Sequence, residues 1–283
     1  VAVGSGALEA NTTAANNTAV GRAALQANTT GAGNVAIGKD ALDSNTTASN
    51  NIAIGMDCLQ TNTTGAENVG IGRNTLQANT TASGNTAVGD SALFANSTGG
   101  SNVAIGANSL DANTTASGNV AVGTSALGAN TTGAANVAVG KEALFTNTTT
   151  ANNTAVGNQA LYNNAGASNT AVGSGALAAN TTGATNVAVG DASLGANTTG
   201  TGNTAVGHDS SLSMTTGGEN TSLGINSLRV ATTGSFNTAI GGGALQNTTT
   251  ASNNTSVGYN SLLANTTGGE NVAIGDGALG ANT

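Results

Sequence analysis

The sequence has no proline, no tryptophan, a single cysteine, and only five aromatic residues, three Phe and two Tyr. These absences exclude a collagen-like helix, which needs proline, and a disulfide scaffold, which needs several cysteines. Charged residues make up 6% of the chain, against about 25% in typical soluble domains, so the composition is not that of an ordinary globular enzyme. Five Lys and Arg residues against thirteen Asp and Glu residues give a formal net charge of −8, which disfavours nucleic acid as a partner.

Long apolar segments are missing as well. No apolar run reaches about 18 residues, so we expect no membrane insertion by this segment. The pattern described next is already under way at Val1 and still running at Thr283. We therefore expect the chain to be part of a longer one.

What the sequence contains is a repeat of one short unit. Each unit has a Gly that follows a small residue and then Val, Ile or Leu, and these marker glycines lie 17 residues apart, except for one step of 16. The shorter step falls within the segment 162–166. No linker or change of composition interrupts the series, so residues 1–283 are predicted to form a single continuous domain. The markers are Gly4, Gly21, Gly38, Gly55, Gly72, Gly89, Gly106, Gly123, Gly140, Gly157, Gly173, Gly190, Gly207, Gly224, Gly241, Gly258 and Gly275.

The unit predicts one short strand per repeat. Seventeen residues cannot hold two helices and a turn, and the Gly and Asn-Thr-Thr positions of each unit disfavour helix. The stretch Asn-Val-Ala-Ile-Gly at 34–38 alternates, is rich in β-branched residues and ends on Gly, as a short strand does. One strand at a fixed period predicts an all-β parallel β-solenoid with one 17-residue repeat per turn, about 17 turns in all.

Columns of equivalent positions predict which side chains point inward. The residue just before each marker is always Val, Ile or Leu, as at Ile37, and the fourth residue after it is Leu, as at Leu42. These two columns, with the Val, Thr or Ile three before the marker, are predicted to form the core. In one unit Ser211 occupies the Leu column, and Leu212 lies one position further along the sequence.

The small residue two before the marker lies on the other face of the strand, so we expect it to point outward. An outward column of small residues favours close approach of another surface. We therefore predict self-association, with a trimer fitting best; a tight turn of a monomer is the alternative interpretation. The predicted self-association face comprises Ala19, Ala36, Ala53, Ala87 and Ala104.

Two asparagine columns are predicted to lie at the corners of the coil, because Asn tolerates the left-handed conformation and can stack into amide ladders. One column is unbroken. The other opens each Asn-Thr-Thr, as at Asn28, and is interrupted at Met214, Ala231 and Thr248. Asn-Thr-Thr is also an N-glycosylation sequon, but we interpret it as a turn signal. The predicted structural ladder is Asn17, Asn34, Asn51 and Asn68 with the markers Gly21, Gly38, Gly55 and Gly72.

A weaker two-unit alternation is superimposed on the repeat. The residue three before the unbroken Asn column alternates between Ala and Gly, as at Ala14, Gly31, Ala48 and Gly65. Growth by duplication of a two-unit block and a real alternation of the turns both explain this pattern, and both remain open at this point.

The segments 34–38 and 102–106, both Asn-Val-Ala-Ile-Gly, resemble the head-repeat motif of YadA-like trimeric autotransporter adhesins, and similar repeats occur in bacteriophage tail fibres. The resemblance recurs in register through the whole array. It implies a left-handed parallel β-roll, three chains around one axis and an adhesive head. This unit is longer than the usual head repeat by its Asn-Thr-Thr segment, and it contains none of the family's stalk, neck or anchor.

Residues suited to catalysis or metal binding are scarce in the sequence. His208 lies on a charged column and Cys58 on a column of small residues, and we interpret them as a surface and a structural residue. Asp40 and Asp43 share one unit, but no neighbouring unit repeats the pair, so no glycosidase-like pair of carboxylates is assigned. We predict no enzymatic activity, no metal and no cofactor, and we assign no catalytic residue.

Three functions remain compatible with this pattern. The favoured one is a non-enzymatic, extracellular structural or adhesive fibre at a cell or virion surface, with a surface ligand that the sequence does not identify. The second is a self-assembling extracellular filament subunit or a phage tail-fibre segment. The third is an ice-binding solenoid, suggested by adjacent Thr columns such as Thr29 and Thr30. Adjacent strand residues point to opposite faces, so only one of these columns can line a flat surface.

Overall fold

A computed structural model describes residues 1–282, and every regular element within them is a short β-strand. The chain divides into two compact units, Val1–Lys141 and Glu142–Thr283. The first unit contains β1 (Ala2–Val3), β2 (Thr18–Val20), β3 (Val35–Ile37), β4 (Ile52–Ile54), β5 (Val69–Ile71), β6 (Thr86–Val88), β7 (Val103–Ile105), β8 (Val120–Val122) and β9 (Val137–Val139). The second contains β10 (Thr154–Val156), β11 (Thr170–Val172), β12 (Val187–Val189), β13 (Thr204–Val206), β14 (Thr221–Leu223), β15 (Thr238–Ile240), β16 (Thr255–Val257) and β17 (Val272–Ile274).

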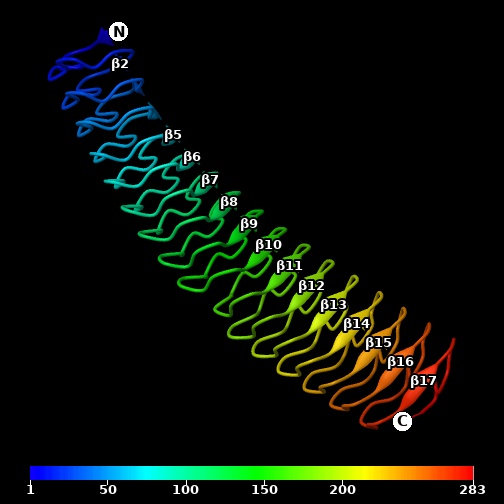
Figure 1. The fold of residues 1–283 in the computed structure, drawn as a ribbon. Coiled ribbons are helices and arrows are strands. Elements are labelled where there is room, and N and C mark those ends of the chain that lie inside the picture. The colour runs from blue at the N-terminus through cyan, green and yellow to red at the C-terminus, as the bar shows by residue number, and fades with distance from the viewer. Residues whose placement is uncertain (283) are drawn as a thin grey trace. The chain divides into compact units, whose positions relative to one another are not determined.

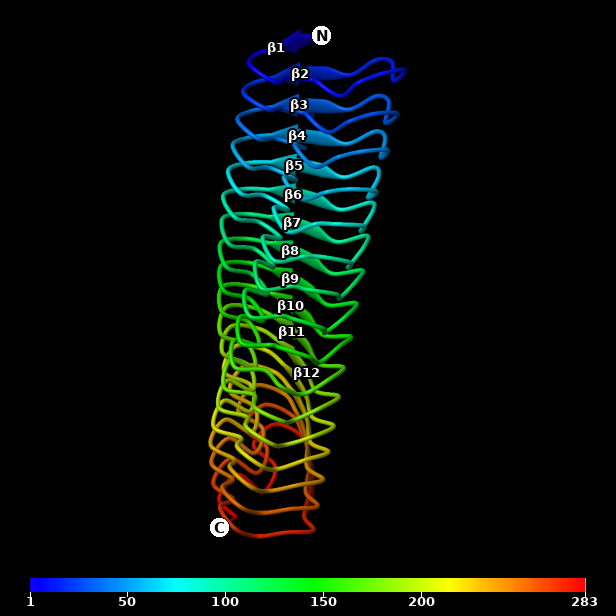
Figure 2. The same ribbon diagram turned by 90° about the vertical axis from the view of Figure 1, so that its left-hand side faces the viewer.

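Within the first unit, each turn of the chain contributes one strand to a parallel sheet. Equivalent residues of successive turns pair directly, as Ala19 does with Ala36 and Val20 with Ile37. The strands therefore lie one above another on the same side of every turn, which the blue to green part of the ribbon shows (Figure 1, Figure 2). The predicted all-β parallel β-solenoid with a 17-residue repeat is confirmed.

The second unit has the same construction, including its one shortened turn. Strand β10 pairs with β11 in the usual register, although Thr154 and its partner Thr170 are 16 residues apart. The missing residue is absorbed in a corner. There Asn164 Nδ2 donates to the carbonyl of Gly166, two residues on, where the equivalent Asn180 reaches Gly183, three residues on.

A corner segment follows each strand and forms the opposite wall of the turn. Every second residue of this segment has a left-handed backbone, with φ of 56° at Asp40 and 51° at Leu42. The N–H groups of the two left-handed residues point to different neighbouring turns. Asp40 N–H donates to Arg22 O of the turn before (2.9 Å), and Leu42 N–H donates to Cys58 O of the turn after (3.0 Å). The corner thus extends the hydrogen-bonded ladder beyond the strands.

The core lies between the strand and this corner. From Leu25 to Leu262 every Leu of this corner column is buried, and Leu42 and Leu59 have no exposed surface. Each such side chain contributes roughly 1.5–3 kcal/mol by leaving water. The middle residue of each strand faces the same interior. At Gly70, which replaces Ala there, an added Cβ would lie 2.6 Å from Cys58 Sγ and 3.6 Å from Leu59 Cδ1.

The predicted orientation of the strands is therefore wrong. Val, Ile and Leu at the strand ends point outward, and Ile37 and Ile105 keep 39% and 41% of their surface exposed. The alanines predicted to face a partner have 0% exposure, so they form no surface for self-association: Ala19, Ala36, Ala53, Ala87 and Ala104. The physical reason is width. Strand and corner enclose a narrow, close-packed interior that Ala and Leu fill together, with no room for a second bulky column.

The Leu column continues through the exceptional unit without a shift. Ser211 has φ 51°, like the leucines of the other turns, and is buried, whereas Leu212 is half-buried. The backbone register of the turn is fixed by its neighbours, and the side chain at this position does not change it.

The marker glycines are required by backbone stacking. Gly21, Gly38, Gly55 and Gly72 have φ between 137° and 140°. A Cβ at Gly38 would lie 2.3 Å from the carbonyl oxygen of Gly55 in the next turn. Any other residue would have to push two backbones apart at this corner.

The two-unit alternation has a structural counterpart in the first unit. Serines of alternate turns accept a hydrogen bond from the backbone of the preceding turn. Ser49 Oγ accepts from Ala32 N–H and Ser83 Oγ from Ala66 N–H, both at 3.0 Å. Alternate turns therefore differ in how this backbone N–H is satisfied, so the alternation is physical as well as a sequence pattern.

Candidate functional site

The ends of the strands form an uncharged surface on the outside of the first unit. Here the outer face of the first unit denotes the first and last residues of β2–β9. Its side chains are half-buried to exposed, and none is charged. The face consists of Thr18, Val35, Ile52, Val69, Thr86, Val103, Val120 and Val137 in one column and Val20, Ile37, Ile54, Ile71, Val88, Ile105, Val122 and Val139 in the other.

The corresponding surface of the second unit has a different composition. The outer face of the second unit denotes the first and last residues of β10–β17. Its first column is mainly threonine and its second is aliphatic, again without charge. The columns are Thr154, Thr170, Val187, Thr204, Thr221, Thr238, Thr255 and Val272, and Val156, Val172, Val189, Val206, Leu223, Ile240, Val257 and Ile274.

The unbroken asparagine column forms a hydrogen-bonded ladder inside the coil. Asn17 Oδ1 accepts the backbone N–H of Asn34 (2.8 Å), Asn34 Oδ1 that of Asn51 (2.9 Å), and Asn51 Oδ1 that of Asn68 (2.9 Å). Most of the amide nitrogens donate across the corner, as Asn34 Nδ2 does to Ala48 O at 2.9 Å. The column satisfies buried backbone groups, which is a structural role.

The second asparagine column is a side-chain ladder. Asn45 Nδ2 donates to Asn28 Oδ1 (2.9 Å) and Asn62 Nδ2 to Asn45 Oδ1 (3.0 Å). These three residues have no exposed surface. Since Nδ2 is the atom that a glycan would modify, the folded turns withhold the sequon nitrogens, and the Asn-Thr-Thr segments act as turn elements.

This ladder is interrupted in the second unit. Met214, Ala231 and Thr248 replace asparagine in three consecutive turns. As a result, Asn197 Oδ1 has no donor from the next turn, and it is the one buried side-chain polar atom without a partner among the residues that the structure describes. An unsatisfied buried acceptor costs about 1–3 kcal/mol.

A buried hydroxyl cluster lies in the same region. Ser210 Oγ lies 2.7 Å from Ser222 Oγ and 3.0 Å from Ser227 Oγ, and Ser211 Oγ lies 2.8 Å from Ser222 Oγ. All four side chains are buried. Sequence analysis missed this cluster. Its signal was the coincidence of Ser211 in the Leu column with Ser222 in the Ala column.

Most basic side chains form ion pairs along the corners. Asp40, which is only 9% exposed, accepts from Arg22 at 2.9 Å and has Lys39 Nζ at 3.3 Å. In another pair Arg73 Nε lies 2.8 Å from Asp90 Oδ1. The hydrogen bond from Arg73 lowers the pKa of Asp90.

Two other carboxyl groups of the first unit have a raised pKa. Burial raises the pKa of Asp43, and the charge of Asp40 adds to this effect while Arg22 opposes it. Burial also raises the pKa of Asp111, against hydrogen bonds from its own backbone and that of Ala112. The surroundings of these two carboxyl groups assign neither of them a role in proton transfer.

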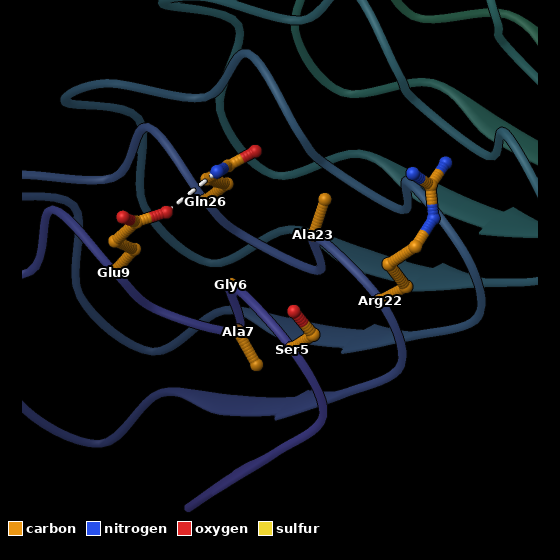
Figure 3. A pocket seen from close by; sticks show the side chains of 7 residues that line it. All are labelled: Ser5, Gly6, Ala7, Glu9, Arg22, Ala23 and Gln26. Carbon is orange, nitrogen blue, oxygen red and sulfur yellow. Dashed lines mark hydrogen bonds between the residues drawn. The ribbon is translucent and has the colours of Figure 1, made fainter.

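A polar hollow of about 480 Å³ lies on the first two turns (Figure 3). Glu9 Oε2 accepts from Gln26 Nε2 at 2.6 Å across it. Arg22 reaches away from it toward Asp40. The lining offers one hydroxyl and no imidazole or thiol, so it has no arrangement for nucleophilic catalysis. It is lined by Ser5, Gly6, Ala7, Glu9, Arg22, Ala23 and Gln26.

The single histidine and the single cysteine do not line this hollow. His208 is exposed, with Nε2 3.8 Å from Asp191 Oδ2 and Nδ1 3.7 Å from Asp209 Oδ2. Cys58 is fully buried, and burial raises the pKa of its thiol to about 12. Residues 1–282 contain no group of three or more His, Cys, Asp or Glu side chains that could hold a metal ion.

Within residues 1–282 the structure has no helix that could span a membrane.

Comparison with known proteins adds no identification. No protein-family model matches the chain. No curated protein matches its sequence.

Proposed function

We propose that this chain is a non-enzymatic structural or adhesive fibre segment that associates with further copies of itself through the outer face of the first unit. The observation that carries the proposal is the composition of that face. Fourteen of its sixteen side chains are Val or Ile and none is charged. Continuous exposed apolar surface of this kind marks contact sites. A location outside the cell, at a cell or virion surface, is part of the same proposal and rests on the adhesin resemblance.

A second copy of this chain is the partner that the face fits. A charged partner would gain nothing from it, whereas two copies present the same aliphatic rows at the same spacing and can align turn by turn. Eight strands at ~4.8 Å, each three residues wide at ~3.3 Å per residue, give roughly 400 Å² of flat area. A standard interface buries about 800 Å² per partner, so one pair would be weak.

A third copy strengthens this arrangement. Three copies around one axis, as the resemblance implies, let every copy contact two others and turn all three apolar faces toward the common axis. The predicted trimer is therefore retained as a proposal, with the aliphatic strand ends replacing the buried alanines as its contact surface.

Mass in solution tests the proposal. We expect light scattering of the intact chain to give a multiple of the 26.6 kDa monomer, and Val35→Lys with Val103→Lys to reduce it to the monomer mass. The matched control is Thr47→Lys with Thr115→Lys, at exposed positions of the same two turns, which should leave the mass unchanged. A monomer at every concentration of the unmodified chain would contradict self-association.

A further inference from the structure

We infer that the outer face of the second unit is an ice-binding surface, with rows of threonine and valine as the groups that contact ordered water. The face differs from its counterpart in one column. Six of its eight first-column residues are Thr, against two of eight in the first unit. The methyl groups of both columns remain, so the difference is the addition of a row of hydroxyls.

These hydroxyls are available to water. No hydrogen bond within residues 1–282 involves the Oγ1 atoms of Thr154, Thr170 or Thr204. The Asn-Thr-Thr threonines are different. The first of each pair uses its hydroxyl inside the coil, as Thr198 Oγ1 does to Thr215 O at 3.0 Å. The second, such as Thr199, is exposed but lies in a bend, not on a strand. The threonines with unpaired hydroxyls are therefore on the strands, and those of the Asn-Thr-Thr segments are not.

The sheet gives the array a regular two-dimensional spacing. In-register pairing, as of Thr204 with Thr221 and Val206 with Leu223, repeats the row every ~4.8 Å along the stack, and alternate residues of one strand lie ~6.6 Å apart. A regular array of small groups in two directions is the kind of surface that fits an ordered layer of water molecules. Methyl groups at this spacing order the adjoining water, and each hydroxyl anchors that water by a hydrogen bond. No charge interrupts the lattice.

At the first turns of the second unit, the residues that border the face leave room for ice to approach it. The corner residues two positions before the strands are small and uncharged there: Asn152, Ser168, Thr185 and Gly202. At the following turns this position is occupied by Glu219 and then by Phe236, which is 57% exposed. The ice-contacting part is therefore expected to centre on β10–β13.

Thermal hysteresis of the intact chain tests this inference. We expect faceted ice crystals and a freezing point below the melting point, and loss of both in Thr170→Lys with Thr204→Lys. The control is Thr182→Lys with Thr216→Lys, exposed positions in the bends that follow the same strands, which should retain both. Thr170→Ser with Thr204→Ser keeps the hydroxyls and removes methyl groups, and we expect reduced hysteresis. Circular dichroism establishes that each variant is folded.

Two outcomes overturn the inference. One is absence of hysteresis and faceting for the unmodified chain. The other is a loss that is equal in the face variant and the bend control. Solution mass keeps this test separate from the proposed function: ice binding fails alone if the unmodified chain is oligomeric and shows no hysteresis. If the Thr170→Lys, Thr204→Lys variant instead becomes monomeric, this face belongs to the contact between copies.

Discussion

The interiors of the two units show how much irregularity this coil accepts. In the first unit the Leu column is unbroken, as at Leu76, and the Asn-Thr-Thr asparagines form a continuous ladder through Asn62. In the second unit Ser211 replaces a Leu and Met214 replaces an Asn. The register of the strands is the same in both. The backbone ladder therefore sets the fold, and the interior side chains set how stable each turn is.

The largest expected effect comes from copying the Ser211 substitution into the first unit. Leu76→Ser should lower the free energy of unfolding by about 2–5 kcal/mol, since a buried Leu is lost and a cavity remains. The thiol of Cys58, one turn away, should react with a thiol reagent only after this unit opens, because it has no exposed surface and burial raises its pKa to about 12. Faster labelling and a lower urea midpoint are the measurements. Thr81→Ser, on the exposed surface of the same unit, is the control, and equal midpoints for the two variants would contradict this role of the Leu column.

The reverse change should make the second unit more regular. Ser211→Leu with Ser222→Ala restores the residues that other turns carry, and burying one Leu adds roughly 1.5–3 kcal/mol. Removing Ser222 at the same time avoids leaving its hydroxyl with fewer partners, while Ser210 keeps Ser227. The urea midpoint should rise. A fall would mean that the hydroxyl cluster is the more stable packing of this turn.

Interrupting the ladder of the first unit should have the next largest effect. Asn62→Met copies Met214 and leaves Asn45 Oδ1 without its donor, at a cost of about 1–3 kcal/mol. Amide exchange should accelerate in the turns that contain Asn45 and Asn79. Thr64→Met, exposed in the same turn, should leave amide exchange unchanged. Equal amide protection in the two variants would show that the ladder does not stabilise these turns.

Completing the ladder of the second unit should give a smaller gain. Met214→Asn with Ala231→Asn and Thr248→Asn supplies a donor to Asn197 Oδ1, and each added hydrogen bond is worth about 0.5–1.5 kcal/mol net. Met214→Asn alone should be nearly neutral, because the unpaired oxygen then moves one turn along the column. Thermal unfolding of the single and triple variants measures the difference. Equal melting temperatures would show that the interruption costs nothing.

The smallest effect concerns Asp43 of the first unit. Its pKa is raised above 3.8 in the folded state, so the folded chain holds this proton more tightly than the unfolded chain. Stability should therefore fall as the pH rises from about 3.8 through the folded pKa, and remain lower above it. Asp43→Asn should remove this dependence and add a few tenths of a kcal/mol at neutral pH, since solvent screens a half-buried group. A pH series of urea midpoints is the measurement, and an unchanged pH profile would contradict it.

Sequence reasoning reached the period, the strands and their stacking because these follow from spacing. It did not reach the orientation of the strands. Alternation divides Val35 and Ile37 from Ala36, but both sets are apolar, so the pattern does not say which set is inside. The answer depends on the width of the cavity, which the left-handed backbone at Leu42 and Asp40 sets, and that conformation has no sequence signal in a Leu. For a similar reason sequence analysis considered the threonines of Asn-Thr-Thr and not those of the strands. Whether a Thr hydroxyl is bonded inside the coil depends on the path of the bends.

The shortened turn of the second unit has a structural consequence. Asn164 stays hydrogen-bonded to both neighbours in its column, at 3.4 Å to Asn147 and 2.7 Å to Asn180, although one residue is missing immediately after it. The bend at Ala165, which is exposed, thus tolerates a change of chain length without disturbing the strands. Repeats of 16 and 17 residues can therefore follow one another in a single parallel sheet without a change of strand register.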